Sequence, residues 1–222
     1  TQAAMVDYIN ENQNYHILTI EDPIEFVHES KKCLINQREV GRNTESFSQA
    51  LRAALREDPD VVVVGEMRDL ETIRLALTAA ETGHLVFATL HTTSAALTIN
   101  RIVDVFPAEE KDMVRSMLSD SLQAVVTQTL LKKVGGGRIA AHEIMIGTPS
   151  VRNLIREDKS AQIYSVIQTS SSLQMKTLDQ SLSVLLDEGL ISLETAREKA
   201  VSPQHISKTE RNSYMSNSQE HN

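Results

Sequence analysis

Short runs of apolar residues alternate along the first half of the chain with longer segments whose apolar residues recur every three or four positions. The clearest run is residues 61–64, four valines that are too few for a buried helix and apolar on both faces. Such a run is typical of a central strand in a parallel sheet that helices cover on both sides. Similar runs at residues 16–20, 33–37 and 84–91 predict three further strands.

Helical spacing of apolar residues separates these runs. It extends over residues 47–55, over residues 73–80 and again over residues 97–102. Ser46 precedes the first of these helices as a plausible N-cap, and Gly83 ends the second. The alternation of strand and helix predicts right-handed crossovers and a parallel α/β sheet.

The next part of the chain has a different pattern. Pro107 breaks the chain before a helix expected over residues 109–124. Residues 125–134 and 138–146 flank three consecutive glycines, which predicts a β-hairpin.

Short helices dominate beyond Gly147, where Thr148 and Pro149 have the types of an N-cap and a first helical residue. The final residues are polar and rich in Ser, Asn and Gln. We therefore expect three parts: an α/β core over residues 1–147, a helical subdomain over residues 148–201, and a disordered tail over residues 202–222.

Composition narrows the class of protein. The 222 residues carry a net charge of −8, which leaves no basic excess for phosphates, so we expect no nucleic-acid partner. The single cysteine, Cys33, excludes an internal disulfide framework and fits a small core residue in a reducing cytoplasm. No stretch is long and apolar enough to cross a bilayer, so we expect membrane contact only through partners.

Acidic residues gather where the predicted strands end. Three of them, Glu21, Asp22 and Glu25, follow the first strand. Glu66 follows the valine run, and His91 ends the last predicted strand. Open α/β sheets bind ligands at this edge, and phosphoanhydride hydrolysis needs oxygens for Mg²⁺, a carboxylate that activates water and a donor that senses the γ-phosphate. The pattern therefore predicts metal-assisted phosphoryl transfer.

The two histidines, His84 and His91, allow other interpretations. A zinc site built from His84 and His91 is disfavoured, because the two ends of one strand lie ~20 Å apart at about 3.3 Å per residue. His84 alone is equally consistent with a histidine at a helix C-terminus, where the helix dipole favours it.

Three arginines, Arg52, Arg56 and Arg68, flank the valine strand. An exposed helix face explains arginines as readily as phosphate contact does. We keep Arg56, together with Asp22, as a nucleotide-binding candidate.

Three long motifs resemble those of the secretion-superfamily hexameric ATPases. Residues 17–26 read Ile-Leu-Thr-Ile-Glu-Asp-Pro-Ile-Glu-Phe and resemble the family's Asp box. Residues 60–69 read Asp-Val-Val-Val-Val-Gly-Glu-Met-Arg-Asp and resemble its atypical Walker B motif. Residues 82–95, from Thr-Gly-His to His-Thr-Thr-Ser-Ala, resemble its His box. The motifs follow the family's order and spacing, and the resemblance implies a RecA-like P-loop NTPase core.

A fourth segment, residues 149–157, reads Pro-Ser-Val-Arg-Asn-Leu-Ile-Arg-Glu. It resembles the retraction motif of the family's type IV pilus motors, Ala-Ile-Arg-Asn-Leu-Ile-Arg-Glu, with Ser-Val in place of Ala-Ile. The resemblance implies that ATP turnover is coupled to pilus retraction through Arg152, Asn153, Leu154, Ile155, Arg156 and Glu157. Spacing alone is equally consistent with an amphipathic helix that packs Val151, Leu154 and Ile155 on the core.

The resemblance also implies roles at the strand ends. Glu25 would activate the attacking water, and Glu66 would hold Mg²⁺ through water. His91, with His84, would link the state of the γ-phosphate to movement between subunits. The implied protein is a homohexameric ATPase for ATP and Mg²⁺ that acts on a pilus platform protein at the cytoplasmic face of the inner membrane. The alternative is a non-catalytic ring subunit or interaction module that modulates such a motor.

One motif of the family does not occur in the chain. No Gly-x-x-x-x-Gly-Lys-Ser/Thr is present, so the backbone cradle and the lysine that bind the β- and γ-phosphates are not among these residues. In the family this loop immediately precedes the residue that matches Thr1. We therefore expect the C-terminal part of a longer motor, inactive alone, rather than a complete degenerate protein.

Overall fold

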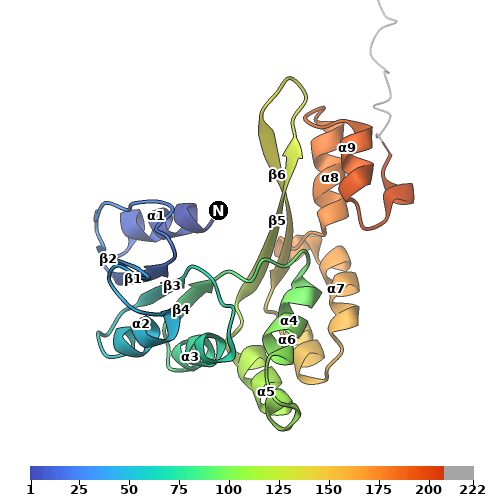
Figure 1. The fold of residues 1–222 in the computed structure, drawn as a ribbon. Helices are drawn as coiled ribbons and strands as arrows, with labels where there is room; N and C mark the ends of the chain where they lie inside the picture. The colour runs from blue at the N-terminus through green and yellow to red at the C-terminus, as the bar shows by residue number, and fades with distance from the viewer. Residues whose placement is uncertain (208–222) are drawn as a thin grey trace, which may run out of the picture. The chain divides into compact units, whose positions relative to one another are not determined.

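The computed structural model describes residues 1–207 of the 222-residue chain. The chain forms two compact units, which are described separately. Unit 1 comprises Thr1–Ala124 and Gly147–Ile163, and unit 2 comprises Val125–Ile146 and the chain from Tyr164 onward. Figure 1 shows the helices and strands of both units.

Four parallel strands form the sheet of unit 1, in the order β2-β1-β3-β4. Their bounds are β1 (His16–Glu21), β2 (Leu34–Glu39), β3 (Val61–Val64) and β4 (Leu85–Ala88). β3 pairs with β1 and β4, and all four of its valines are buried. The predicted parallel α/β sheet with a central valine strand is therefore confirmed.

Helices precede the sheet of unit 1, connect β2 to β3 and β3 to β4, and follow β4. They are α1 (Gln2–Asn12), α2 (Phe47–Ala54), α3 (Leu70–Glu81), α4 (Ala95–Asp104), α5 (Lys111–Ser121) and α6 (Pro149–Arg156), with short 3-10 turns η1 (Ala108–Glu110) and η2 (Ser160–Gln162). The Ser46 side chain accepts from the backbone N–H of Gln49, which confirms the predicted cap of α2. Beyond α3, Gly83 adopts φ +102°, the left-handed conformation that ends many helices.

Two predicted elements are shorter in the structure. The helix expected over residues 109–124 ends at Ser121, because Leu122 turns to an extended conformation and Ala124 already begins β5. The strand expected over residues 84–91 keeps only β4, because the chain turns after it and His91 takes a φ of 52°.

A buried cluster beside β1 and β3 is aliphatic apart from one thiol. One cluster consists of Val6, Ile17, Cys33, Val61 and Val63. Cys33 is a free thiol that is only 3% exposed. Its expected role as a small core residue is confirmed.

Unit 2 is built on the hairpin of β5 (Ala124–Lys132) and β6 (Arg138–Ile146). It also contains α7 (Ile163–Thr169), α8 (Leu178–Asp187) and α9 (Leu193–Lys199), with 3-10 turns η3 (Ser171–Leu173) and η4 (Pro203–His205). One buried cluster joins the hairpin to α8 and α9, and its members are Leu131, Ala141, Leu178, Leu182, Leu186, Ile191, Ala196 and Ile206. The hairpin and the C-terminal helices therefore share a core.

The observed units differ from the boundary expected at residue 147. The hairpin groups with the C-terminal helices because it contributes to their core, whereas α6 packs on α5 and groups with the sheet. Ordered contacts also extend past residue 201, since the backbone N–H of Ser202 donates to Asp179 (2.9 Å) and Ile206 is buried. Residues 208–222 of the predicted tail lie outside the described residues.

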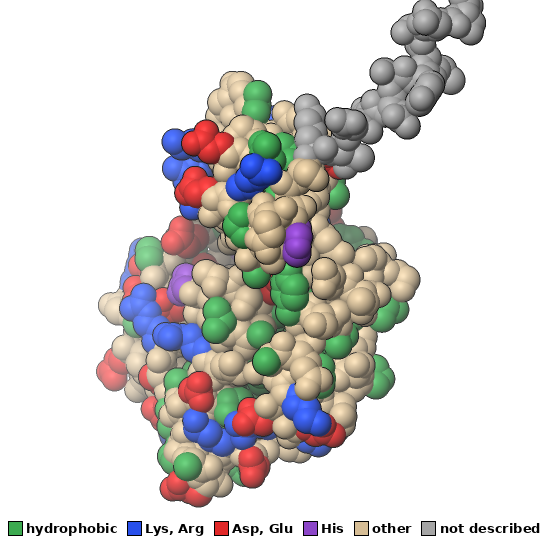
Figure 2. Space-filling view, turned by 90° about the vertical axis from the view of Figure 1, so that its right-hand side faces the viewer, with side chains coloured by type: hydrophobic (Ala, Val, Ile, Leu, Met, Phe, Trp, Pro, Cys, Tyr) green, Lys and Arg blue, Asp and Glu red, His purple; other side chains and the backbone are tan. Residues whose placement is uncertain are grey.

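Within the described residues, no helix combines the length and apolarity that a bilayer span requires. On the face of the molecule drawn in Figure 2, basic and acidic side chains are interspersed. Ion pairs such as Lys111–Asp104 and Arg115–Asp158 (both 2.8 Å) join some of the charged side chains of unit 1. The acids of both pairs are exposed, whereas the Lys111 and Arg115 side chains are only 29% and 14% exposed.

Candidate active site at the carboxyl edge of the sheet

The register of the sheet brings the ends of three strands together. Ile20, Val64 and Ala88 are neighbours across β1, β3 and β4. The residues that follow them form one edge, called here the carboxyl edge, where open α/β sheets bind ligands. The opposite edge, where the strands begin, is called the amino edge.

Gly65 joins the three strands at the carboxyl edge. Its N–H donates to Ile20 O (2.7 Å), and its carbonyl accepts from the Thr89 hydroxyl. A Cβ at Gly65 would lie 3.1 Å from Ile20 O and 3.2 Å from the Cα of Glu21. The position therefore favours glycine, because a side chain here would need the end of β1 to shift by a few tenths of an ångström.

The Glu66 carboxylate is mostly buried at this edge, with 14% of its side chain exposed. Its Oε2 atom lies 2.8 Å from Nη2 of Arg68 and 3.8 Å from Nε2 of His91, the second contact being an ion pair only when the imidazole is protonated. The side chains of Arg68 and His91 are about three-quarters exposed, at 76% and 75%. Each of these two side chains can therefore move away from Glu66 and contact a ligand instead.

His91 stands in an uncommon backbone conformation, with φ 52°. For a residue other than glycine this left-handed conformation costs roughly 1–2 kcal/mol. The chain on either side is fixed by hydrogen bonds, from Met67 N–H to Thr89 O (3.0 Å) and between the hydroxyls of Thr92 and Thr98 (2.6 Å). This turn brings the imidazole to Glu66.

The acids that follow β1 differ in their surroundings. Glu21 uses both carboxylate oxygens, since Oε1 accepts from the Thr19 hydroxyl (2.6 Å) and Gln37 Nε2 (3.1 Å), and Oε2 lies 3.4 Å from the donating backbone N–H of Glu25. The Glu21 carboxylate therefore has a structural role, because both of its oxygens accept hydrogen bonds from β1, β2 and the residues that follow β1. The side chains of Asp22 and Glu25 are exposed just beyond the end of β1.

His84 and Arg56 lie at the amino edge. His84 precedes β4, and its Nδ1 is 3.0 Å from Ala79 O near the end of α3. Arg56 is exposed between α2 and β3. The structure thus brings His91 to Glu66 but leaves His84 and Arg56 at the other edge of the sheet. In the described part of the chain, no group of three or more His, Cys, Asp or Glu side chains is arranged to hold a metal ion.

The segment that resembles a retraction motif forms α6 and its C-cap, and α6 packs on α5. Val151 and Ile155 are buried, whereas Leu154 is only partly buried. The amphipathic prediction is therefore confirmed at two of its three apolar positions. Thr148 caps the helix by accepting from the backbone N–H of Val151 (3.3 Å).

Arg152 closes the C-terminal end of α5. Its Nε donates to Gly147 O (2.7 Å), and its Nη1 donates to Ser119 O (2.7 Å) and to Asp120 O. The last carbonyls of a helix have no partner within the helix, so the guanidinium satisfies groups that need one. Arg152 therefore has a structural role of its own.

The other polar residues of the segment are exposed. Arg156 Nη2 lies 2.9 Å from Asp120 Oδ1, and Asn153 Nδ2 donates to Glu157 Oε1 (3.0 Å). Hydrogen bonds from Lys159 and then from Asn153 lower the pKa of Glu157 below its ordinary value.

Two side chains of the site were missed by sequence reasoning as partners of the acids. Arg68 was left open between an exposed helix face and phosphate contact, although its spacing of two residues from Glu66 at a strand end is a usable signal. Gln37 contacts Glu21 because it pairs with Thr19 across β1 and β2. That pairing has no signal in the sequence.

Known proteins share this sequence and fold. A family model described as "Type II/IV secretion system protein" matches residues 1–197. The chain belongs to this family. Among its relatives, the Pseudomonas aeruginosa protein named "Type IV pilus retractation ATPase PilT" is 75% identical over 206 residues, which cover 93% of this chain and 60% of that protein. The Neisseria gonorrhoeae "Twitching motility protein" is 66% identical over 208 residues, or 93% of this chain and 56% of that protein.

Solved structures of secretion-family ATPases have the same fold. The structure described as "Crystal Structure of the Pilus Retraction Motor PilT and Bound ADP" matches with a TM-score of 0.85 and 56% identity, over 92% of this chain and 58% of that chain. The Legionella pneumophila ATPase DotB matches with a TM-score of 0.80 and 30% identity, over 89% of this chain and 55% of that chain. The resemblance to secretion ATPases is confirmed. The chain spans between half and two thirds of the length of these relatives.

Proposed function

We propose that this chain works in a motor that hydrolyses ATP to retract type IV pili and so drives twitching motility. One observation carries the proposal: Glu66 faces Arg68 and His91 at the carboxyl edge, in a fold shared with an ADP-bound pilus retraction motor. High identity to two proteins named for pilus retraction and twitching motility supports it.

In this proposal each acid at the edge has its own task. Glu25, exposed beyond β1, takes a proton from the attacking water. Glu66 holds the metal through water, and His91 beside it responds to the γ-phosphate. Asp22 is a further polar contact for the nucleotide.

Mg²⁺ fits the donors at the carboxyl edge. This ion prefers oxygen ligands and is usually held by one or two carboxylates, several waters and substrate phosphates. Glu66 offers such a carboxylate, and the side chains beside it, Arg68 and His91, are exposed and can move aside. When bound, the ion would neutralise charge that develops on the phosphates.

We also propose a homo-oligomeric ring of six subunits that acts on a pilus platform protein at the cytoplasmic face of the inner membrane. Arg56 and His84 stand at the amino edge, away from Glu66 of the same chain. A role for them at the nucleotide therefore requires a neighbouring subunit. Asn153 and Arg156 of α6 are exposed, which supports a role in passing movement to a partner.

The test of catalysis is phosphate release by the complete protein from ATP, with and without Mg²⁺. We expect hydrolysis that depends on Mg²⁺, and we expect Glu25→Ala and Glu66→Ala to abolish turnover while ATP still binds. Full turnover in both variants would overturn the assignment. A wild-type protein that forms rings without hydrolysing ATP would instead indicate a non-catalytic ring subunit.

A second experiment separates turnover from retraction. Arg156→Ala removes an exposed contact to Asp120 that contributes little to stability, so we expect normal hydrolysis with loss of twitching. Arg152→Ala leaves three carbonyls without the guanidinium that donates to them, so it should destabilise the packing of α6 on α5. It shows what loss of stability, rather than loss of coupling, does to hydrolysis and twitching. Normal twitching in a stable Arg156→Ala protein would remove this residue from the coupling role.

A further inference from the structure

The loop between β1 and β2, residues 22–33, carries Glu25 without regular secondary structure. Around Glu25 its apolar side chains do not fix it, because Phe26 and Val27 are 54% and 75% exposed. Side chains outside the loop hold its backbone through hydrogen bonds. Gln37 and Asn10 each hold two or more backbone groups of the loop, and Glu21 and Glu39 hold one each.

Gln37 binds the loop with both ends of its amide. Its Oε1 accepts from His28 N–H (2.8 Å), and its Nε2 donates to Phe26 O (2.9 Å) and to Glu21 Oε1 (3.1 Å). The acceptors near Nε2 and the donor near Oε1 fix the orientation of the amide. Gln37 thus pairs with the loop as a neighbouring peptide group would.

The register of the sheet explains why Gln37 reaches these groups. Thr19 pairs with Gln37, and Glu21 pairs with Glu39, across the parallel strands β1 and β2. Side chains two residues apart stand on the same face of a strand, so these four lie together. Glu39 adds a contact of its own, because its Oε2 accepts from the backbone N–H of Ile24 (3.1 Å).

Glu21 extends the hold of Gln37 to Glu25 itself. One carboxylate oxygen of Glu21 accepts from Gln37, and the other lies 3.4 Å from the backbone nitrogen of Glu25. The backbone on both sides of the Glu25 side chain is therefore tied to the Gln37 amide, directly at Phe26 and through Glu21 at Glu25.

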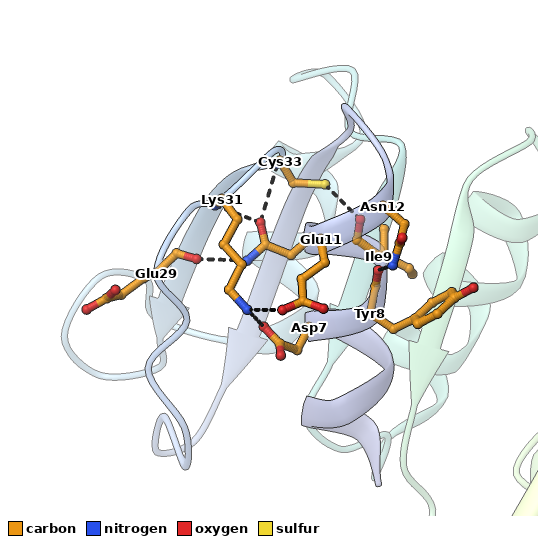
Figure 3. A network of polar contacts seen from close by, with 9 residues as sticks. Asp7, Tyr8, Ile9, Glu11, Asn12, Glu29, Lys31 and Cys33 are labelled. Carbon is orange, nitrogen blue, oxygen red and sulfur yellow. Dashed lines mark hydrogen bonds and ion pairs between the residues drawn. The ribbon is translucent and has the colours of Figure 1, made fainter.

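Asn10 of α1 holds the far end of the loop. It is completely buried, its Nδ2 donates to Glu29 O (2.8 Å), and its Oδ1 accepts from Lys31 N–H (2.9 Å) and Cys33 N–H (3.3 Å). Figure 3 shows Lys31 and Cys33 against α1, with the Lys31 ammonium also paired to Asp7 (2.7 Å). Asn10 therefore holds residues 29–33, whereas Gln37 holds Phe26 and His28, the residues that directly follow Glu25.

We propose that Gln37 is a positioning residue for ATP hydrolysis, which clamps residues 25–28 and so presents the Glu25 carboxylate at the carboxyl edge. The proposal rests on the proposed role of Glu25 as the group that activates water. Gln37 itself touches no reacting atom. Its contribution comes from holding a catalytic group in a productive geometry, for which small displacements are costly.

The test compares Gln37→Ala, Glu25→Gln and the double variant in the complete protein. We expect Gln37→Ala to lower kcat by roughly 10- to 100-fold with little change in the KM for ATP. If Gln37 acts through Glu25, the double variant will be no slower than Glu25→Gln alone. Losses that multiply, or a kcat for Gln37→Ala within twofold of wild type, would overturn the proposal.

Two further variants separate positioning from general damage. Gln37→Glu keeps the acceptor for His28 but loses the donor and sets a carboxylate against Glu21, so we expect it to be impaired like Gln37→Ala. Asn36→Ala is the matched control, because it removes the neighbouring amide of β2, which contacts His16 (2.9 Å) instead of the loop. Equal losses in Asn36→Ala and Gln37→Ala would show that Gln37 has no special role.

Amide hydrogen exchange tests the clamp on the loop separately from the catalytic role of Glu25. The backbone N–H of His28 should exchange faster in Gln37→Ala than in Asn36→Ala, whatever the loop does in catalysis. Unchanged exchange would overturn the clamp. Faster exchange together with full turnover in Glu25→Gln would leave the clamp standing and overturn the proposed role of Glu25, and with it the positioning role of Gln37.

Discussion

The two edges of the parallel sheet carry the same residue types in different surroundings. At the amino edge, the Asp60 carboxylate accepts from the backbone N–H of His16 (2.8 Å), and His84 Nδ1 contacts Ala79 O (3.0 Å). Both side chains are committed to backbone groups at the start of a strand and the end of a helix. Their partners cannot move without local unfolding.

At the carboxyl edge, an acid and a histidine contact side chains instead. Glu66 Oε2 lies 2.8 Å from Arg68 and 3.8 Å from His91, and both partners are largely exposed. Such partners can rotate away when a ligand arrives. The comparison shows that the hydrogen-bond or ion-pair partner of an acid or histidine at a strand end predicts a functional role better than the residue type does.

The largest expected effect is a difference in turnover between two variants, each of which removes one carboxylate charge, one at the carboxyl edge and one at the amino edge. Glu66→Gln should slow ATP hydrolysis by about 100- to 1,000-fold, because the amide is a poor substitute for a charged group at the metal. Asp60→Asn keeps an oxygen that can accept from His16, so its turnover should match wild type. Phosphate release measured in parallel on both variants checks the prediction.

The outcome that would break the comparison is equal loss in these two variants. A circular dichroism spectrum and a denaturant midpoint for each variant are the controls, since a misfolded sheet would also be inactive. We expect both midpoints to remain close to wild type, because neither change alters side-chain size.

A smaller effect is expected from the two histidines. His91→Ala should lower turnover by about 10- to 100-fold, which corresponds to the 1.5–3 kcal/mol of a charge-assisted hydrogen bond made in the transition state. His84→Ala should leave turnover within a single chain's site intact and cost about 1 kcal/mol of stability through the lost contact with Ala79. Steady-state hydrolysis and urea unfolding of both variants measure this contrast.

Loss of turnover in a well-folded His84→Ala protein would have a specific meaning. His84 is at the amino edge of its own chain, so the loss would place it at the nucleotide of a neighbouring subunit. Mixing His84→Ala and wild-type subunits would then give activity that falls out of proportion to the variant fraction.

Much of the fold could be predicted from the residues alone. The valine run predicts the central strand because four buried β-branched residues suit a strand with both faces covered. Ser46 predicts a helix start because its hydroxyl satisfies a free N–H. The position of β1 between β2 and β3 could not be predicted, because pairing order depends on tertiary packing rather than on local pattern.

The candidate site could be predicted only in part. The acids at the strand ends were found because parallel strands bring their carboxyl ends together. The strand pattern alone did not separate Glu21 from Glu25, and only the family resemblance singled out Glu25. The two acids differ in their neighbours: Glu21 accepts hydrogen bonds from Thr19 and Gln37, and Glu25 is exposed. Those neighbours follow from the register of β1 with β2, which the sequence does not encode locally.

Two glycines extend the comparison to the backbone. Gly65→Ala at the carboxyl edge should lower turnover several-fold and destabilise the protein by about 1–3 kcal/mol, because the new methyl group meets Ile20 O at 3.1 Å and displaces the end of β1. Gly83→Ala at the amino edge has open space around it, so the cost should be about 1–2 kcal/mol of left-handed strain without loss of turnover. Activity and urea midpoints measured together distinguish the two, and a Gly65→Ala protein with full activity would show that the end of β1 tolerates displacement.

The smallest effect tests whether position at the carboxyl edge is enough to make an acid catalytic. Asp69 follows Glu66 by three residues, but its carboxylate accepts from the backbone N–H of Thr72 (2.9 Å) and from the Thr72 hydroxyl (2.8 Å). It is the N-cap of α3, so Asp69→Ala should cost about 1 kcal/mol of stability and leave turnover unchanged. Ser46→Ala, which removes the cap of α2, is the matched control and should give the same pattern. If Asp69→Ala lost turnover while Ser46→Ala did not, an acid that is hydrogen-bonded to the backbone would still take part in catalysis. The type of hydrogen-bond partner would then no longer distinguish catalytic from structural acids at the strand ends.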